Sequence, residues 1–412
     1  MPPDSVPAPA QPTLPRPTPV FLSFPLWETS GVATWARTLI DGFPDERLAQ
    51  RLLVTADPGH GTSVPASLPF EALPYTPDRQ RQWSRLAAFL RDRAPCIYVP
   101  NFDFHRSCAI GLLPPSVAVC SILHSDEDCY YDELERLRHR IDAVVAVSPQ
   151  IAAKAREHFP KLGHRLRTIP YGVPVPGDIA ERPRDRPLEL LYCNRLSQYQ
   201  KQVFELPKLA LKLRELRVPF VLRIAGDGPD RDALAQGFRH AGFNSAEVAF
   251  LGPLDPGGVA AACQRADLFV LTSAFEGLPL SLLEAMAAGC IPVVYRVESG
   301  IPEVIRDPDN GCITPMNDPA AMAARIRELA GDPFLRRRIS QRAHATIREH
   351  YSASVMQQAY AELFGQLREQ GRAGTCRPGD GRIRLPRDLT LAHRLMRRLR
   401  SLPFLAYVAV RT

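Results

Sequence analysis

Short apolar runs alternate with segments of helical periodicity along most of this chain. The runs lie at 20–24, 52–54, 96–99, 117–123 and 143–147, and then at 188–192, 220–225, 248–251, 268–271 and 291–294. Segments with apolar residues at helical spacing separate them, at 31–41, 83–93 and 150–158, and at about 202–216, 229–241, 257–265 and 279–288. This alternation predicts an α/β protein with two doubly wound domains, whose ligand binds in a central cleft at the carboxyl ends of parallel strands.

Changes in composition mark the expected domain boundaries. Residues 1–18 hold seven prolines and almost no packing residues, which is typical of a disordered or polyproline-like arm. A polar linker at 181–187 separates the two α/β series. We therefore expect domains at 19–180 and 188–350, a final helix at 351–370 with Ser352 as its N-cap, and a tail at 371–412.

Charge and cysteine content exclude several classes of protein. The net charge of +7 is a property of the tail, because residues 371–412 hold ten arginines and two acids and the rest of the chain sums to about −1. The nearly neutral charge of the rest of the chain therefore argues against nucleic-acid binding by the folded domains. No apolar run reaches the roughly 18–20 residues of a membrane span, and the N-terminus lacks the pattern of a signal peptide. Nine cysteines without a C-x-x-C pair fit reduced thiols in a cytoplasmic protein.

The most informative local pattern surrounds Glu276 and Glu284. A short apolar strand ends near Leu271, Gly277 and Pro279 interrupt it, and a helix is expected from Pro279 to about Ala288. The free N–H groups at a helix N-terminus form an anion site, and carboxylates beside it can hold hydroxyl groups. The pattern therefore predicts a ligand that carries both phosphates and sugar hydroxyls, although an ordinary amphipathic helix would also contain such glutamates.

Other strand ends carry candidate ligand-binding residues. Arg195 and Lys201 follow a strand and precede a helix, where two cations can converge on a diphosphate. Gly31 stands at a helix start, where a missing Cβ lets a phosphate approach the backbone. The turn at 225–229 contains Gly228 but lacks the third glycine of a dinucleotide fingerprint. His124 ends an apolar strand, where it either contacts a ligand or merely caps the strand.

The stretch from Ser273 to Val294 resembles the E-x7-E signature of retaining GT-B glycosyltransferases, in particular family 4 (group 1). The resemblance covers residues 19–370 and has three departures: Asn194 replaces a common glycine, the interval from Arg195 to Lys201 is one residue longer than usual, and Ser30 replaces the first of a glycine pair. It implies a GT-B fold, a C-terminal helix that crosses back to the N-terminal domain, and no metal ion or cofactor. The acids Asp126, Glu127 and Asp128 are accordingly interpreted as helix-start or acceptor-contacting residues rather than as metal ligands.

The resemblance also implies roles for individual residues. Glu276 is expected to hold hydroxyls of the transferred sugar, Glu284 the ribose, and His124 the sugar near its reacting carbon. Arg195 and Lys201 would stabilise the diphosphate as it leaves, which accelerates the chemistry as well as binding the donor. The remaining donor-binding residues are expected to be Gly31, Gly228, Leu278, Pro279, Leu280 and Ser281.

The predicted reaction is transfer of a sugar from a nucleoside-diphosphate-sugar donor to a saccharide or lipid-linked acceptor, in bacterial polysaccharide or glycolipid synthesis. Glu276 is expected to face sugar hydroxyls rather than to act as a nucleophile, so same-face substitution is favoured over a covalent intermediate. The alternatives are another GT-B enzyme, such as a sugar-nucleotide epimerase or a phosphorylase, and a non-catalytic nucleotide-sugar-binding protein. The base, the sugar and the acceptor stay open.

The tail contains a basic amphipathic pattern. Leucines recur at helical spacing within residues 388–402, and arginines fill the positions between them. Such a helix suits an anionic membrane surface, which would place a cytoplasmic protein at the inner face of the membrane. A helix docked on the body or a disordered basic end are the alternatives.

Overall fold

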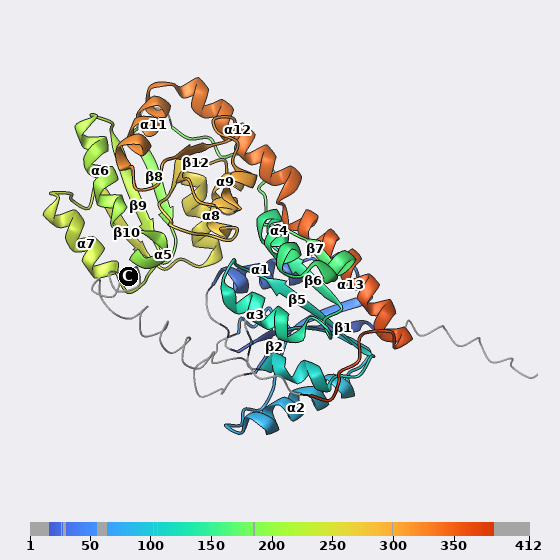
Figure 1. Cartoon of the computed structure of the whole chain (residues 1–412). Helices are drawn as coiled ribbons and strands as arrows, with labels where there is room; N and C mark the ends of the chain where they lie inside the picture. Colours follow the sequence, from blue (N-terminus) through green and yellow to red (C-terminus); the bar gives the residue numbers. More distant parts are fainter. Residues whose placement is uncertain are drawn as a thin grey trace, which may run out of the picture.

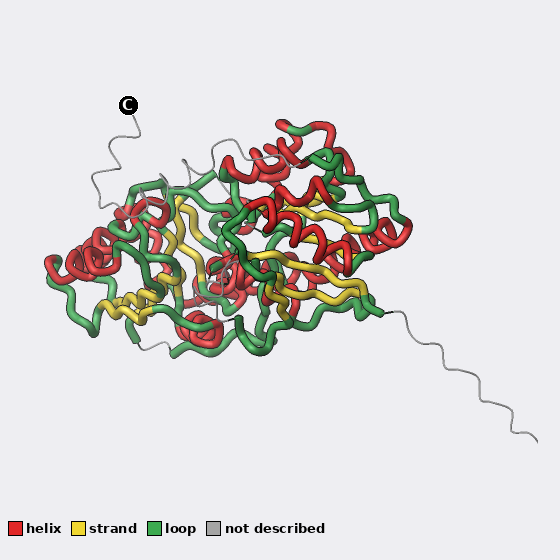
Figure 2. Tube along the Cα trace, turned by 90° about the horizontal axis from the view of Figure 1, so that it is seen from below, coloured by secondary structure: helices red, strands yellow, loops and turns green. Residues whose placement is uncertain are grey.

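The computed structural model describes residues 16–382, except residues 26, 28, 29, 56–63, 102, 105, 184, 185 and 299. Two parallel sheets, each covered by helices, make up two domains (Figure 1). Figure 2 shows the same arrangement from below, with the strands inside and most helices outside. The proline-rich arm up to residue 15 and the amphipathic segment 388–402 lie outside the described residues.

The first sheet has seven strands in the order β3-β2-β1-β4-β5-β6-β7. Its strands are β1 (Thr18–Phe24), β2 (Leu48–Val54), β3 (Phe70–Ala72), β4 (Cys96–Val99), β5 (Val117–Leu123), β6 (Ala143–Ala146) and β7 (Leu166–Thr168). The helices between them are α1 (Gly31–Ile40), α2 (Arg79–Asp92), the 3-10 helix η2 (Arg106–Leu112), α3 (Asp128–Leu137), α4 (Pro149–His158) and the 3-10 helix η3 (Pro160–Arg165). All pairings are parallel, and β4 and β5 are entirely buried, as expected for strands covered on both faces.

The second sheet has six parallel strands in the order β10-β9-β8-β11-β12-β13. They are β8 (Leu188–Cys193), β9 (Phe220–Ala225), β10 (Val248–Gly252), β11 (Leu268–Leu271), β12 (Ile291–Tyr295) and β13 (Cys312–Thr314). The helices that connect them are α5 (Gln198–Lys201), α6 (Glu205–Glu215), α7 (Arg231–His240), α8 (Pro256–Arg265), α9 (Leu280–Ala287) and α10 (Ile301–Val304). In both sheets the strand order reverses beside the first strand, which confirms the predicted doubly wound α/β class.

Several helices begin where an aspartate precedes a proline. α8, α11 (Pro319–Gly331) and α12 (Pro333–His350) each have the aspartate as N-cap and the proline in their first turn. Asp255 accepts a hydrogen bond from Gly258 N at 2.7 Å, and Asp318 accepts one from Ala321 N at 2.8 Å. The side chain satisfies a free N–H of the first turn, and proline has no N–H to leave unsatisfied.

The last helix, α13 (Ala353–Ala373), leaves the second domain and packs on the first (Figure 1). Ser352 caps it, as predicted, by accepting from Val355 N. Where it crosses, Val173 N donates to Tyr351 O at 2.9 Å and Ala353 N donates to Val173 O at 2.8 Å. Further along, Gln357 Nε2 donates to Thr38 O of α1 at 2.7 Å. The C-terminal helix therefore ties the two domains together.

The segment after α13 also lies on the first domain. Arg377 N donates to Asp142 Oδ1 at 2.7 Å, and Gly379 N donates to Leu113 O at 3.1 Å. The described part of the tail, up to residue 382, is thus fixed to the body. Within the described residues, no helix is both long and apolar enough to cross a membrane. All nine cysteines carry free thiols.

The structure contains elements that the sequence pattern did not predict. β3 and β13 have three residues each and lie at the edges of their sheets. β3 is largely exposed, so it lacks the apolar run of a central strand. α3, by contrast, begins in the acidic stretch as predicted, with Glu127 as its N-cap and Asp128 in its first turn. These acids therefore occupy a helix start, where the helix dipole favours negative charge.

Candidate active site

Two loops at the carboxyl end of the second sheet carry most of the predicted residues. One loop follows β8 and contains Arg195, and it leads into α5, which ends at Lys201. The other follows β11, contains Glu276 and leads into α9. β8 and β11 are neighbours at the point where the strand order reverses. In doubly wound sheets this position opens a crevice for ligands.

Lys201 and Glu276 form an ion pair that joins the two loops. Lys201 Nζ lies 2.5 Å from Glu276 Oε1, and Ser273 Oγ donates to the same oxygen at 2.5 Å. Backbone contacts support the pair, because Thr272 Oγ1 donates to Lys201 O at 2.8 Å and Ala274 N donates to Gln200 O at 2.8 Å. The side chains of Lys201 and Glu276 are only 11% and 6% exposed. A desolvated charge pair with a fixed position therefore stands at the carboxyl end of the sheet.

Arg195 stands exposed on the same loop. The loop is held by the turn after β9, where Leu196 N donates to Asp227 O at 2.9 Å and Gln198 N donates to Asp230 Oδ2 at 2.7 Å. A Cβ on Gly228 would lie 2.3 Å from Leu196 O, so only glycine permits this approach. The structure thus places Gly228 under the Arg195 loop, where it fixes the position of a predicted phosphate-binding cation.

The N-terminus of α9 lies beside these charges. Leu278, Pro279 and Leu280 are buried, and Ser281 Oγ donates to Asn194 Oδ1 at 3.1 Å. Pro279 is the N-cap residue and has no side chain that could accept from the first turn. The hydrogen bond from Ser281 shows why an asparagine fits at position 194, because glycine would offer no side-chain acceptor there.

The first domain meets the same loops. A Cβ on Gly277 would lie 3.0 Å from His124 O, and one on Gly31 would lie 3.6 Å from Leu280 Cδ1. The N-terminus of α1, where Ser30 Oγ accepts from Ala33 N at 3.2 Å, therefore faces the N-terminus of α9 across the domain boundary. The predicted residues Gly31 and His124 of one domain are thus brought together with Glu276 and Leu280 of the other.

His124 is buried and bonded through both ring nitrogens. Nδ1 lies 2.8 Å from Tyr171 Oη, and Nε2 lies 2.9 Å from Asn101 Oδ1. Trp35 packs edge-on against the ring, with 5.0 Å between the centroids. Burial lowers the pKa of His124 to about 3, so the ring is neutral near pH 7. A neutral ring that donates from Nε2 to Asn101 and accepts at Nδ1 from Tyr171 satisfies both contacts.

The partners of His124 and Glu276 include residues that the sequence reasoning did not select. Asn101 follows β4 and Ser273 follows β11, so both stand at carboxyl ends of strands, which is the signal that could have identified them. Asp103 is a third such residue, and it accepts from Ser23 Oγ at 3.2 Å and from Thr55 Oγ1 at 2.6 Å. This network connects the ends of β1, β2 and β4 beneath the site.

Glu284 lies further along α9 and is separated from the ion pair. It is half-buried, and burial raises the pKa of its carboxyl to about 7. Near neutral pH the carboxyl therefore exists in both protonation states.

Asp126 and Glu127, two of the three acids considered above, are already engaged by protein groups. Asp126 Oδ1 lies 2.9 Å from Lys154 Nζ and accepts from Tyr131 Oη at 2.7 Å. Glu127 Oε2 accepts from Ser125 Oγ at 3.0 Å. Among the residues that the structure describes, no three His, Cys, Asp or Glu side chains are grouped as metal ligands would be.

Comparison with known proteins identifies the second domain. Residues 179–346 match the family model described as Glycosyl transferases group 1. An exopolysaccharide phosphotransferase of Streptomyces coelicolor is 31% identical over 257 residues, which are 62% of this chain and 26% of that protein. A glycogen synthase of Mycobacterium tuberculosis is 32% identical over 186 residues, 45% of this chain and 44% of that protein. HepE from Anabaena, crystallised with UDP, has a TM-score of 0.65 at 17% identity, over 85% of this chain and 100% of that one.

The comparisons support the sequence reasoning at the level of family and fold. Residues 179–346 form a group 1 glycosyl transferase domain, as predicted, and the likeness to HepE shows the GT-B fold across both domains. The chain spans only 26% and 44% of the length of the two curated relatives described above. The retaining mechanism and the assignment to family 4 stay predictions.

Proposed function

We propose that this chain is a retaining glycosyltransferase that moves a sugar from a nucleoside-diphosphate-sugar donor to a saccharide or lipid-linked acceptor in bacterial polysaccharide or glycolipid synthesis. The observation that carries the proposal is the 2.5 Å ion pair of Lys201 and Glu276 beside the N-terminus of α9, with His124 of the other domain against the same loop. A cation and a helix N-terminus suit phosphates, and a fixed carboxylate suits sugar hydroxyls. A donor with both groups fits this arrangement.

The same geometry favours substitution on one face of the sugar. Glu276 Oε1 already accepts from Lys201 and Ser273, so the carboxylate is oriented by protein donors and its charge is partly neutralised. Such a carboxylate is a weak nucleophile. In the proposed step the bond from the anomeric carbon to the phosphate oxygen breaks, and the acceptor oxygen bonds to the same face. The acceptor proton passes to the leaving phosphate, whose charge Lys201, Arg195 and α9 stabilise. No metal ion or cofactor takes part.

The relatives narrow the proposed substrates. HepE was crystallised with UDP, so a uridine nucleotide is the first donor to test, followed by guanosine and adenosine nucleotides. The glycogen synthase relative makes a saccharide the first acceptor to test. A non-catalytic binding protein and an epimerase are the competing functions.

A donor screen followed by product analysis tests the proposal. We expect one of UDP-glucose, GDP-mannose and ADP-glucose, or a related sugar, to raise the melting temperature, because a ligand at about 100 times its Kd stabilises the folded state by about 2.7 kcal/mol. With an acceptor, proton NMR of the product should show the anomeric configuration of the donor. An inverted product would refute the retaining mechanism. Interconversion of donor sugars without acceptor would favour an epimerase instead.

Donor binding should depend on pH through Glu284. Burial raises the pKa of its carboxyl to about 7, and only the ionised form is a pure acceptor for two ribose hydroxyls. Because the carboxyl is protonated below that pKa, we expect the donor Kd to rise about tenfold between pH 8 and pH 6. Calorimetric titration at several pH values measures this dependence. In the Glu284→Gln variant the donor should bind weakly at every pH, and a full pH dependence retained in that variant would assign the titration to another group.

The tail is proposed to bind an anionic membrane surface through residues 388–402. The segment up to Arg382 packs on the first domain, so the informative truncation removes only residues 383–412. We expect the full chain to sediment with vesicles that contain phosphatidylglycerol at low salt, and the truncated chain to stay in solution with an unchanged melting temperature. Neutral phosphatidylcholine vesicles are the control. Equal sedimentation of both proteins would disprove membrane binding by the tail.

A further inference from the structure

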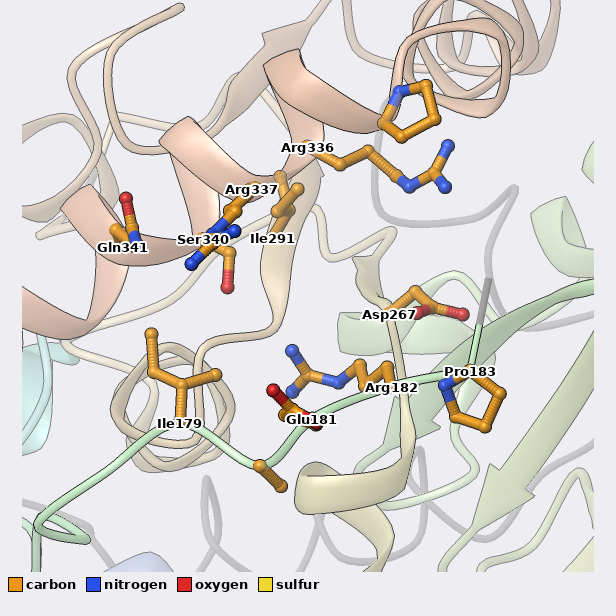
Figure 3. A pocket seen from close by; sticks show the side chains of 12 residues that line it. Ile179, Glu181, Arg182, Pro183, Asp267, Ile291, Arg336, Arg337, Ser340 and Gln341 are labelled. Carbon is orange, nitrogen blue, oxygen red and sulfur yellow. The ribbon is translucent and has the colours of Figure 1, made fainter. Parts of the chain in front are cut away.

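A cavity of about 410 Å³ lies in the second domain at the end of the sheet opposite to Lys201 and Glu276. Asp267, directly before β11, and Ile291, the first residue of β12, line it from the sheet. The interdomain linker at 179–183 forms one wall, and α12 forms another (Figure 3). The volume is within the range of sites for small molecules. None of the residues proposed for the donor contributes to it.

Three arginines give this cavity a positive wall. The side chain of Arg337 is exposed and makes no hydrogen bond or ion pair with any residue that the structure describes. Arg336 uses one nitrogen, Nη1, to donate to Leu329 O at 2.6 Å and to Ala330 O at 2.9 Å at the end of α11. Arg182 donates to Ala288 O at 2.8 Å, while its Nε is buried without a partner in the described part of the chain. Both terminal nitrogens of Arg182 are thus bonded to the body, because Nη1 donates to Gly289 O at 3.2 Å. Since a guanidinium has five N–H donors, Arg336 and Arg337 keep donors for an anion, and Arg182 contributes its positive charge.

Groups suited to hydroxyls surround the arginines. Ser340 Oγ donates to Gly289 O at 2.6 Å and retains its acceptor capacity, and the Gln341 amide offers both donors and an acceptor. Glu181 and Asp267 supply carboxylates on the side of the linker. Asp267 is partly engaged, because its Oδ2 accepts from Glu189 N at 2.9 Å and pairs with Arg186 at 3.0 Å. Cations on α12 and carboxylates opposite them match a ligand with an anionic end and a hydroxylated end.

We propose that this cavity binds a small phosphorylated sugar, with the phosphate on Arg336 and Arg337 and the sugar hydroxyls toward Glu181, Asp267 and Gln341. Arginine matches the geometry of phosphate oxygens through its planar fork. The site is separate from the donor site, and the proposal does not depend on the reaction that the protein catalyses.

The position of the cavity couples it to the donor site. Arg182, which lines the cavity, donates to Ala288 O directly after α9. At the other end of this helix, Ser281 bonds to Asn194 of the loop that leads to Lys201. A Cβ on Gly289 would lie 2.7 Å from Ile179 Cγ2 and 3.0 Å from Ser340 Oγ, so α9, the linker and α12 are in close contact there. α12 leads directly to Tyr351 and the crossing of the chain to the first domain. The two chain connections between the domains, the linker and the segment after α12, therefore both begin at walls of the cavity. We expect a ligand in the cavity to change the affinity of the protein for the donor nucleotide.

Titration calorimetry of the full chain with glucose 1-phosphate and with inorganic phosphate tests the site. We expect glucose 1-phosphate to bind more tightly than phosphate, because only the sugar engages the carboxylate side. Arg337→Ala should weaken binding of glucose 1-phosphate at least tenfold with an unchanged melting temperature. Arg338→Ala is the matched control, because it removes the next arginine of α12, which is exposed and does not line the cavity, and it should bind like the wild type.

Three results would overturn the proposal. They are the absence of binding by both probes, equal weakening in Arg337→Ala and Arg338→Ala, and loss of binding in Lys201→Met, which would place the probe in the donor site. The coupling has its own readout, the Kd of UDP with and without glucose 1-phosphate. We expect a change of about fivefold or more in the wild type and none in Arg337→Ala. An unchanged Kd of UDP in wild-type protein saturated with glucose 1-phosphate would refute the coupling.

Discussion

Replacing Lys201 with methionine is expected to lower kcat about 10²–10³-fold, the range observed when one donor to a developing oxyanion is removed. Methionine keeps much of the length of the side chain but removes the positive charge that we assign to the leaving diphosphate. The substitution also leaves the Glu276 carboxylate without the cation that now lies 2.5 Å away. We therefore expect a larger loss in kcat than in donor affinity, because the charge on the diphosphate increases as the glycosidic bond breaks.

Two further variants separate this effect from a general loss of structure. Lys208→Met removes another lysine of the same domain that pairs with a glutamate, Glu205, at 2.7 Å, and it should leave kcat unchanged. In the double variant Lys201→Met/Glu276→Gln, the two losses should be strongly non-additive, because both substitutions break the same contact. Steady-state kinetics of the wild type, Lys201→Met, Glu276→Gln and the double variant measure the coupling. A normal kcat in Lys201→Met would show that Lys201 does not stabilise the leaving diphosphate. Additive losses would show that Lys201 and Glu276 do not act together in catalysis.

Much of the fold follows from local sequence patterns. Buried runs such as Val117–Leu123 predict central parallel strands because helices cover both faces of the sheet, so all positions but Ser121 are apolar. The short strands Phe70–Ala72 and Cys312–Thr314 escaped prediction because three residues cannot display a period, and the sheet beside them determines their conformation. Local patterns therefore identify elements that carry their own burial signal and miss those that tertiary pairing creates.

The sequence predicts which residues form the candidate site, but it does not predict the hydrogen bonds between them. The sequence predicts different ligand groups for Glu276 and Lys201, a sugar and a phosphate, because a sequence pattern does not show that side chains 75 positions apart share a hydrogen bond. His124 was selected at its strand end, but its partners Asn101 and Tyr171 come from other segments of the first domain. Spacing predicts which residues reach the carboxyl end of a sheet. It does not predict which of them bond to one another there.

The hydrogen bonds of the His124 ring determine which atoms of this residue can contact a substrate. Both ring nitrogens contact protein groups, and the backbone carbonyl is the part of His124 that lies closest to Gly277 of the other domain. A sugar hydroxyl that bonded to the ring would have to replace Asn101 or Tyr171. The carbonyl oxygen, by contrast, lies 3.5 Å from Tyr171 Oη and is directed toward Gly277 of the other domain. The predicted contact of His124 with the transferred sugar is therefore best tested at Asn101 and Tyr171 as well as at His124.

Substitution of Glu276 distinguishes same-face substitution from a covalent mechanism. Glu276→Ala should lower kcat at least about 100-fold, since the carboxylate positions the sugar and a misplacement of about 1 Å costs that much. Glu284→Ala should mainly raise the donor Kd.

Azide rescue tests directly whether Glu276 is a nucleophile. If it were, azide could enter the space left by alanine and attack the anomeric carbon from the face opposite to the diphosphate. The product would be a glycosyl azide of inverted configuration. We expect no rescue by azide, because in same-face substitution the carboxylate forms no bond to the sugar. Mass spectrometry and NMR of the products detect the azide adduct, and its formation by Glu276→Ala but not by Glu284→Ala would establish a covalent mechanism instead.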